Sequence, residues 1–300
     1  MITAAPHISV MLDEVVDLFR ATTSGCIIDG TVGQGGHSEA ILAATPDTVK
    51  VIGFDRDPQA VQFSANRLAP FGARFAAIHS GYESAAEIIA ARGLGPVTGV
   101  LLDLGLSSTQ LGSSRGFSFS GGDEQPLDMR FDPSDEATAA DVIRSTPANV
   151  LADRFRALAE VPMAGRLARI LKEESGKGRM ETVGDFVAVC HRVYGPRMRK
   201  LPSPTLPAQA LRIMVNLELD RLTDFFGGLD GLVAPGGRLV VISFHSGEDR
   251  IVKHTMRRMA LTGDWVLPFR KAMVPGAVEC DRNSRAKCAR LRALDRVGGK

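Results

Sequence analysis

Short apolar segments alternate with longer spacers through the first hundred residues of the chain. Four such segments span residues 26–29, 51–55, 75–79 and 99–105, and each has the length and composition of a buried strand. The spacers between them are long enough to hold crossover helices, which neighbouring parallel strands require. We therefore predict an α/β fold built on a doubly wound parallel sheet.

This alternation stops after Ser108 and resumes only near the C-terminus. Residues 109–135 are rich in Gly, Ser and Asp, and helical periodicity without a clear strand continues to about residue 200. The prolines of 201–207 predict a linker, because proline lacks an amide donor and has a restricted φ. Helical spacing then runs from Leu211 to Gly227 and Gly228, and a further strand is expected over 238–245.

The simplest domain arrangement is one α/β domain interrupted by a helical one. We predict that residues 1–108 and 208–300 form the α/β domain and that residues 109–207 form an inserted, mainly helical domain. The insertion has a size typical of an independent folding unit.

Charge is distributed unevenly along the chain. Residues 250–300 carry 13 Lys and Arg against 4 Asp and Glu, a balance of +9, while the remaining residues sum to −7. This pattern predicts either a face that meets a polyanion or a solvated basic tail. The candidate phosphate contacts are Arg282, Arg285, Lys287, Arg290 and Arg292, with a second basic cluster at Arg192, Arg197, Arg199 and Lys200.

Composition excludes several other classes of protein. The chain has neither an uninterrupted apolar run of 18 residues nor a basic-then-apolar leader, so we expect a cytoplasmic protein without a membrane partner. The cysteines form no CxxC pair, which supports neither a disulfide framework nor a zinc site. They are Cys26, Cys190, Cys280 and Cys288.

A glycine-rich loop follows the first predicted strand. The sequence DGTVGQGGH runs from Asp29 to His37, and its glycines allow the backbone to approach a ligand closely. A dinucleotide fingerprint needs a third glycine or alanine where this chain has Ser38. Asp29 suits the methionyl amine of S-adenosylmethionine better than a pyrophosphate, and Asp55, at the end of the second strand, suits ribose hydroxyls. We therefore favour S-adenosylmethionine over NAD.

A third aspartate, Asp103, ends the fourth strand and precedes the segment 104–111. Ligands of doubly wound sheets bind at the carboxyl ends of strands, so Asp29, Asp55 and Asp103 are expected to converge on one crevice. Enzymes that methylate amino groups place a polar residue at this strand end, usually followed by two prolines and an aromatic residue. Here the three following residues are Leu104, Gly105 and Leu106, so spacing alone leaves the target amine open.

The chain also resembles the bacterial 16S ribosomal RNA cytosine-N4 methyltransferase family along nearly its whole length. The motifs that carry the resemblance are HISVMLDEVVD (7–17), IDGTVGQGGHS (28–38), FDRDPQA (54–60), LLDLGLSSTQL (101–111), RGFSF (115–119), PLDMR (126–130), QALRIMVNLEL (209–219), APGGRL (234–239) and SFHSGEDRIVK (243–253). The resemblance implies a Rossmann-like methyltransferase sheet, an inserted substrate-recognition domain, and methylation of a cytosine in the decoding region. It also implies 16S rRNA or the small ribosomal subunit as partner.

The resemblance and the residue patterns together nominate a site. The expected cofactor contacts are Asp29, Gly33, Gly35, Gly36, His37, Asp55, Tyr82, Asp103 and Gln110. Tyr82 stands where the family commonly has Phe, which keeps a ring face for adenine. Asp103 is the expected acceptor for the target amine, with Ser107, Ser108 and His245 as the other candidate catalytic residues. A structural role for His245 is equally compatible with the sequence. No metal is expected.

Two departures from the family pattern bear on the substrate. They cover residues 158–163 and 205–208, at the inserted domain and its exit. We expect an S-adenosylmethionine-dependent RNA methyltransferase, with a same-fold enzyme for another RNA or DNA, an RNA-binding ribosome-assembly factor, or a nicotinamide oxidoreductase as alternatives. The oligomeric state stays open, a homodimer included.

Overall fold

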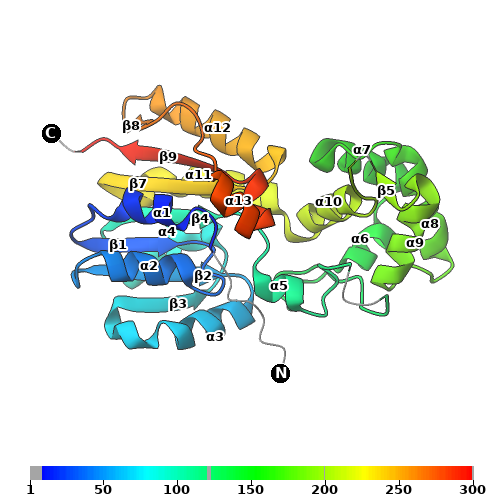
Figure 1. The fold of residues 1–300 in the computed structure, drawn as a ribbon, viewed down its shortest axis with the longest axis horizontal. Helices are drawn as coiled ribbons and strands as arrows, with labels where there is room; N and C mark the ends of the chain where they lie inside the picture. The colour runs from blue at the N-terminus through cyan, green and yellow to red at the C-terminus, as the bar shows by residue number, and fades with distance from the viewer. Residues whose placement is uncertain (1–8, 120–122, 199, 299–300) are drawn as a thin grey trace. The chain divides into compact units, whose positions relative to one another are not determined.

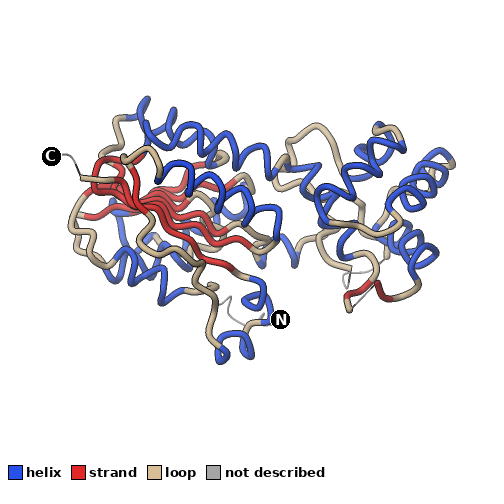
Figure 2. The backbone as a smooth tube through the Cα atoms, turned by 90° about the horizontal axis from the view of Figure 1, so that it is seen from above, coloured by secondary structure: helices blue, strands red, loops and turns tan. Residues whose placement is uncertain are grey.

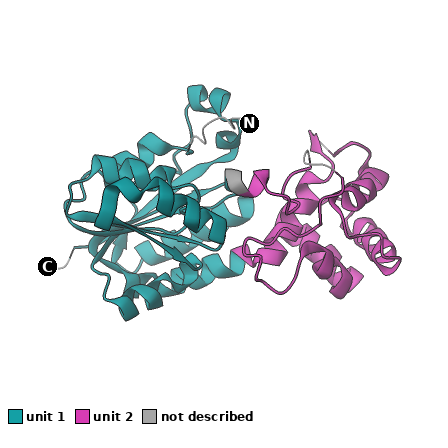
Figure 3. Ribbon diagram, turned by 90° about the horizontal axis from the view of Figure 1, so that it is seen from below, with its two compact units in different colours: residues 1–107, 219–300 teal, residues 108–218 magenta. Residues whose placement is uncertain are grey.

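The computed structural model describes residues 9–119, 123–198 and 200–298, with the backbone alone at Ser108 and Thr109. The chain divides into two compact units (Figure 3). Unit 1 comprises Met1–Ser107 and Leu219–Lys300, and unit 2 comprises Ser108–Glu218. Unit 1 therefore resumes at residue 219 instead of the predicted residue 208.

Unit 1 is built on a seven-stranded sheet with the order β3-β2-β1-β4-β7-β9-β8. The strands are β1 (Gly25–Asp29), β2 (Val49–Asp55), β3 (Phe75–His79), β4 (Val97–Asp103), β7 (Val233–Ser243), β8 (Trp265–Val266) and β9 (Arg290–Arg296). The first five in spatial order run parallel, and β9 pairs antiparallel with both β7 and β8. This confirms the predicted doubly wound, Rossmann-like sheet. The chain adds β2 and β3 on one side of β1 and β4 on the other, so a topological switch point lies between β1 and β4.

Helices cover both faces of this sheet (Figures 1 and 2). The helical segments of unit 1 are α1 (Leu12–Phe19), α2 (Gly36–Ala44), α3 (Pro58–Arg67), η1 (Ala69–Arg74), η2 (Tyr82–Ser84), α4 (Ala85–Arg92), α11 (Glu218–Leu232), α12 (Ser246–Ala260), α13 (Ala277–Arg282) and η3 (Ser284–Cys288). Neighbouring strand residues enter opposite cores, as Ile27 and Ile28 do in β1. This explains why the strands are continuously apolar, because successive side chains point to opposite faces and both faces are buried.

Unit 2 is mainly helical, as predicted for the insertion. Its elements are α5 (Ser108–Gly112), α6 (Ala139–Ser145), α7 (Ala148–Ala159), α8 (Ala164–Gly176), α9 (Val183–Tyr194), β5 (Arg197–Met198), β6 (Leu201–Pro202) and α10 (Thr205–Asn216). Capping boxes at Thr138 and Thr182 begin α6 and α9. Within the described residues, no helix is both long and apolar enough to cross a membrane.

The boundary differs from the prediction because α10 packs within unit 2, against α6 and α7. Asn216 strengthens this packing, since its side chain accepts from the Phe131 amide at 2.7 Å and donates to the Met129 carbonyl at 2.8 Å. The predicted linker at 201–207 is also wrong. It forms β6 and the first turn of α10, where Pro207 is tolerated because amides there need no intrahelical partner.

The predicted single helix from Leu211 to Gly228 is two helices. They meet at Leu217, whose φ of 51° is left-handed and therefore lies outside what a helix interior permits. The second helix, α11, continues through Gly227 and Gly228 to Leu232. Phe225 and Leu229 of this helix are buried in the hydrophobic core on one face of the sheet. This packing stabilises the helix despite the low helix propensity of the two glycines.

Candidate active site

Three aspartates end three neighbouring strands of the unit 1 sheet. Asp29 ends β1, Asp55 ends β2 and Asp103 ends β4, and the spatial order of these strands is β2-β1-β4. Parallel strands bring their carboxyl ends to one edge, which is the edge beside the switch point. The three residues predicted to converge thus lie along one edge of the sheet.

The glycine loop between β1 and α2 packs closely against side chains of neighbouring segments. Gly33 and Gly35 have φ values of 50° and 77°, which glycine adopts at little cost. A Cβ atom on Gly36 would lie 2.3 Å from Ser9 Oγ. At Gly36 the loop therefore has room for backbone only, which suits a site that receives a ligand against its amides.

Asp55 holds this loop in place. Its Oδ2 accepts a hydrogen bond from the Gly33 amide at 2.9 Å, and its Oδ1 accepts one from the Asp57 amide, also at 2.9 Å. Burial raises the pKa of Asp55 to about 6, although the two amides act in the opposite direction. A carboxylate oxygen has two lone pairs, so each oxygen can accept one further hydrogen bond.

Asp29 ties the end of β1 to the start of α2. Its Oδ2 accepts from Ser38 Oγ at 2.7 Å and its Oδ1 accepts from the Thr31 amide at 3.3 Å. The side chain is buried, and burial raises its pKa. Both oxygens of Asp29 therefore already support the loop that surrounds the candidate site.

His37 and Asp103 form the most unusual pair at this edge. His37 Nε2 lies 3.4 Å from Asp103 Oδ2, within ion-pair range but without the alignment of a hydrogen bond. Within the described ranges, Asp103 Oδ1 and both ring nitrogens of His37 are buried without a hydrogen-bond partner. Buried polar atoms are nearly always paired, so these atoms have capacity for a ligand.

The charge state of His37 depends on the acids around it. Burial by itself would lower the pKa of His37, but Asp103, Asp29 and Glu279 outweigh burial and raise the pKa above its ordinary value. Thr31 also links the two strands, since its Oγ1 accepts from the Asp103 amide at 2.7 Å. The loop, His37 and Asp103 are thereby joined in one buried polar network.

Tyr82 and Ser107 complete the part of the site in unit 1. Tyr82 Cβ lies 2.8 Å from the position of a Cβ on Gly30, and its ring packs edge-on against Phe225 with centroids 5.7 Å apart. Ser107 Cβ lies 3.7 Å from the corresponding position on Gly33. Both predicted residues therefore border the glycine loop.

Comparison of the sequence with known families decides the assignment. Residues 4–297 match the sequence model of the MraW methylase family. The chain belongs to this family. The predicted family and the methyltransferase activity are confirmed, and the nicotinamide oxidoreductase alternative is wrong.

Relatives of this methylase cover nearly all of its length. It is 36% identical to the ribosomal RNA small subunit methyltransferase H of Nitratidesulfovibrio vulgaris, over 98% of this chain and 96% of the relative. It is 39% identical to the protein of the same name from Sorangium cellulosum, over 98% and 91%. An rRNA methylase structure from Streptococcus thermophilus aligns with a TM-score of 0.42 at 12% identity, covering 97% of this chain and 99% of that one.

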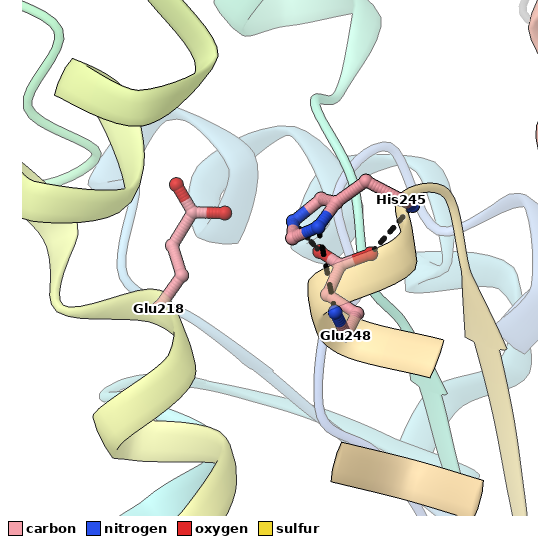
Figure 4. Close-up of side chains that lie close together, drawn as sticks. All are labelled: Glu218, His245 and Glu248. Atoms are coloured by element: carbon pink, nitrogen blue, oxygen red, sulfur yellow. Dashed lines mark hydrogen bonds and ion pairs between the residues drawn. The ribbon is translucent and has the colours of Figure 1, made fainter. Parts of the chain in front are cut away.

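His245 caps a helix of the methylase (Figure 4). Its Nδ1 accepts from the Glu248 amide at 3.4 Å, while Glu248 Oε2 accepts from the Phe244 and His245 amides at 2.8 Å and 3.3 Å. His245 Nε2 also lies 3.1 Å from Glu248 Oε1. These contacts provide the structural role that the sequence left open, at the start of α12.

Two predicted site residues, Ser108 and Gln110, belong to unit 2. Gln110 is buried on α5 in unit 2, so unit 1 alone does not bring it to the edge of the sheet. The Ser108 side chain lies outside the described part of the chain.

Sequence reasoning missed a residue that acts from far along the chain. Glu279 of α13 accepts from the Met11 amide at 2.7 Å and contributes to the raised pKa of His37. Met11, with a left-handed φ of 52°, is the N-cap residue of α1. It lies two residues after Ser9, whose side chain approaches Gly36. No local pattern marks Glu279, because its partners are distant in sequence.

The residues predicted to contact phosphates differ in their surroundings, because some are paired with other groups of the chain and others are exposed. Arg292 is wrong as a free RNA contact, because its guanidinium bonds Asp249 at 2.8 Å and its side chain is only 13% exposed. Arg192 pairs with Glu174 at 3.2 Å, and Arg285 donates to the Leu106 carbonyl at 3.4 Å. Arg199 lies outside the described residues. The remaining members are exposed: Arg197, Lys200, Arg282, Lys287 and Arg290.

Proposed function

We propose that this methylase transfers a methyl group from S-adenosylmethionine to the exocyclic N4 of a cytosine in the decoding region of 16S rRNA. The family match over residues 4–297 carries the proposal, and the shared name of its relatives supports ribosomal RNA as the substrate. Unit 2 would recognise the RNA, and the substrate would be 16S rRNA or the small subunit in the cytoplasm.

The residues at the carboxyl edge of unit 1 fit the cofactor. S-adenosylmethionine supplies a methyl group already activated by a sulfonium, so we expect no metal ion to take part. Asp55 has lone pairs for ribose hydroxyls, and the loop at Gly33, Gly35 and Gly36 has close-approaching backbone. Tyr82 offers a ring, while Asp29, His37, Asp103 and Gln110 are the further proposed contacts.

Asp103 is the proposed acceptor for the target amine. Its buried Oδ1 can accept a hydrogen bond from an N4–H and so turn the nitrogen lone pair away from conjugation with the ring. This contact strengthens as the nitrogen becomes positive, which stabilises the transition state more than the ground state. Ser107, Ser108 and His245 remain the alternative acceptors, and the buried edge also excludes water from the reacting groups.

Both departures from the family pattern lie in unit 2, and the first includes the exposed residues Glu160 and Met163, through which it could alter RNA recognition. Residues 158–163 form the turn between α7 and α8, where Met163 is 51% exposed and Tyr194 Oη donates to the Pro162 carbonyl at 2.7 Å. Residues 205–208 form the first turn of α10. Both segments include the end of a helix. This supports the interpretation that the departures change a contact with RNA and do not disrupt the fold of unit 2.

Methyl transfer to defined acceptors tests the proposal. The purified chain is incubated with labelled S-adenosylmethionine and, separately, with small subunits, free 16S rRNA and DNA, all from cells that lack the gene. We expect label in ribosomal RNA, recovered as N4-methylcytidine by nucleoside mass spectrometry. Label confined to DNA or another RNA would support a different substrate, and binding of RNA without transfer would support an assembly factor.

A further inference from the structure

Helix α12 has one buried face and one strongly basic face. Its buried residues are Glu248, Val252, Met256 and Met259, and the helix packs on β7, β8 and β9 of the sheet (Figure 1). At 100° per residue, the opposite side of the helix is centred on Arg250, His254 and Arg257, flanked by Lys253 and Arg258. We call these five residues the α12 basic face. Four of them are exposed and Lys253 is half-buried.

The acids of α12 are already engaged elsewhere. Glu248 caps the helix, and Asp249 accepts from Arg292 Nε and Nη2 at 2.8 Å and 3.2 Å. Within the described residues, none of the five side chains of the α12 basic face forms an ion pair or a hydrogen bond. Exposed arginines elsewhere do pair, as Arg20 does with Asp17 at 3.1 Å and Arg156 with Asp153 at 2.6 Å.

The spacing within the α12 basic face is unfavourable for an isolated helix. Lys253 and Arg257 are four residues apart, and like charges at this spacing destabilise a helix. The cost falls when an anion neutralises the face. Arg257 and Arg258 lie in the last turn of α12, where cations complement the helix dipole. An anionic partner would account for the cations nearer the start of the helix as well.

The position of α12 relates this face to the candidate site. The helix starts at Ser246, just after β7 ends at the same carboxyl edge as Asp103, and runs back toward the opposite edge, where β8 pairs with the end of β9. Arg250 is therefore the member of the face nearest to the carboxyl edge. Arg250 to Arg258 span about 12 Å along the helix. Arg290 extends the row, because it pairs in register with Ser243 and alternation places it on the same face of β9 as Arg292, which contacts α12.

The charge of the site edge argues that RNA phosphates are bound away from it. Asp29, Asp55 and Asp103 would repel a phosphate, yet the target nucleotide has to enter beside them. An RNA strand that reaches this edge gains its electrostatic binding energy from cations farther along its path. The α12 basic face supplies such cations on unit 1 itself.

We propose that the α12 basic face binds the sugar-phosphate backbone of the substrate RNA along the strand that leads to the nucleotide to be methylated. The inference rests on the proposed function for the identity of the polyanion. It moves the RNA contact from the predicted η3–β9 segment to an outer helix face, with Arg290 at the junction of the two.

A charge-matched pair of variants tests the proposal. The test variant replaces Arg250, Arg257 and Arg258 with alanine. The control replaces Arg20, Lys50 and Arg92, which are also exposed but lie outside α12 and β9. Affinity for small subunits and for free 16S rRNA is measured over a range of salt concentrations, together with affinity for S-adenosylmethionine and the thermal unfolding midpoint.

We expect the test variant to lose about tenfold or more in RNA affinity at low salt, with the logarithmic salt slope reduced by about 2. The control should keep the wild-type slope, and both variants should bind S-adenosylmethionine normally. Equal slopes in the test variant and the control would overturn the assignment. If the triple variant unfolds, the single charge reversal Arg257→Glu, on an exposed side chain, gives the same comparison.

The two proposals fail in different ways. A wild-type chain that methylates ribosomal RNA beside a test variant with an unchanged slope contradicts only the α12 assignment. A wild-type chain that binds RNA through α12 without transferring methyl groups contradicts only the proposed reaction. A wild-type chain that binds no RNA overturns both.

Discussion

His37 and Asp103 face each other across the switch point of the sheet, with Nε2 and Oδ2 3.4 Å apart. His37 comes from the first turn of α2, after β1, and Asp103 ends β4. Because the two strands are neighbours, residues that are far apart in sequence share one buried environment. This pair couples the protonation of the His37 imidazole to Asp103, the proposed acceptor of the target amine.

The first prediction concerns the protonation of His37. Asp103→Asn should lower the pKa of His37, because the nearest carboxylate that opposes the effect of burial becomes neutral. Imidazole resonances followed by NMR over pH measure this value, and His191 of unit 2 provides an exposed reference in the same spectra. An unchanged His37 titration would mean that the two groups are not electrostatically coupled.

The same pair has a consequence for stability. The pKa of folded His37 is raised above its unfolded value, so the pair contributes stability that is complete below the unfolded pKa and is lost as pH rises through the folded pKa. Chemical denaturation at several pH values should show this loss in the wild type and less of it in Asp103→Asn.

The second prediction concerns Asp55, whose pKa is raised from 3.8 to about 6 by burial. The ionised form accepts hydrogen bonds from ribose hydroxyls best, so S-adenosylmethionine should bind about tenfold more weakly at pH 5 than at neutral pH. Without ligand the sign for stability is opposite, since the folded state loses stability as pH rises from about 4 to 6. Calorimetric titration across this range measures the binding effect.

Variants of Asp55 separate binding from loop support. Asp55→Ala should weaken S-adenosylmethionine by about 1.5 to 3 kcal/mol, the range for hydrogen bonds to a charged group. Asp55→Asn cannot ionise, so it should abolish the pH dependence while retaining an oxygen for one of the two loop amides. Unchanged affinity in both variants would remove Asp55 from the cofactor site.

The third prediction concerns the chemistry at Asp103. Asp103→Ala should slow single-turnover methyl transfer by about 10² to 10³, as expected for the loss of one hydrogen bond made mainly in the transition state. Asp103→Asn retains the shape and one acceptor oxygen, and so isolates the effect of the charge. Near-native rates in both variants at saturating S-adenosylmethionine and RNA would transfer the acceptor role to Ser107, Ser108 or His245.

The fourth prediction concerns the close approach of Ser9 to the glycine loop. Gly36→Ala should weaken S-adenosylmethionine binding and lower stability, because the added Cβ would lie 2.3 Å from Ser9 Oγ. The double variant Gly36→Ala with Ser9→Ala should recover much of both losses, since the remaining contact with Ser9 Cβ is an ordinary 3.6 Å. Strictly additive effects in this double-mutant cycle would mean that the clash does not cause the defect.

Local patterns in the sequence were sufficient for the five parallel strands of the sheet and for the acids that end three of them, but they did not predict β5, β6, β8 or β9. Continuous apolar runs predicted β1 to β4 and β7 because both faces of a parallel sheet are buried, and the aspartates that end β1, β2 and β4 could be read directly. Glycine spacing predicted the loop before α2. Asp29, Asp55 and the lack of a third loop glycine favoured S-adenosylmethionine as cofactor, and the family motifs supplied the reaction, which strand periodicity alone cannot specify.

Tertiary structure decided which distant residues meet. Sheet order placed β1 beside β4, and thereby His37 beside Asp103, while α13 brought Glu279 to the Met11 amide. Antiparallel pairing of β9 with β7 placed Arg292 against Asp249 of α12. Packing of α10 on α7 set the boundary at Glu218. These outcomes depend on long-range packing, whereas sequence periodicity reports only which face of each element is buried.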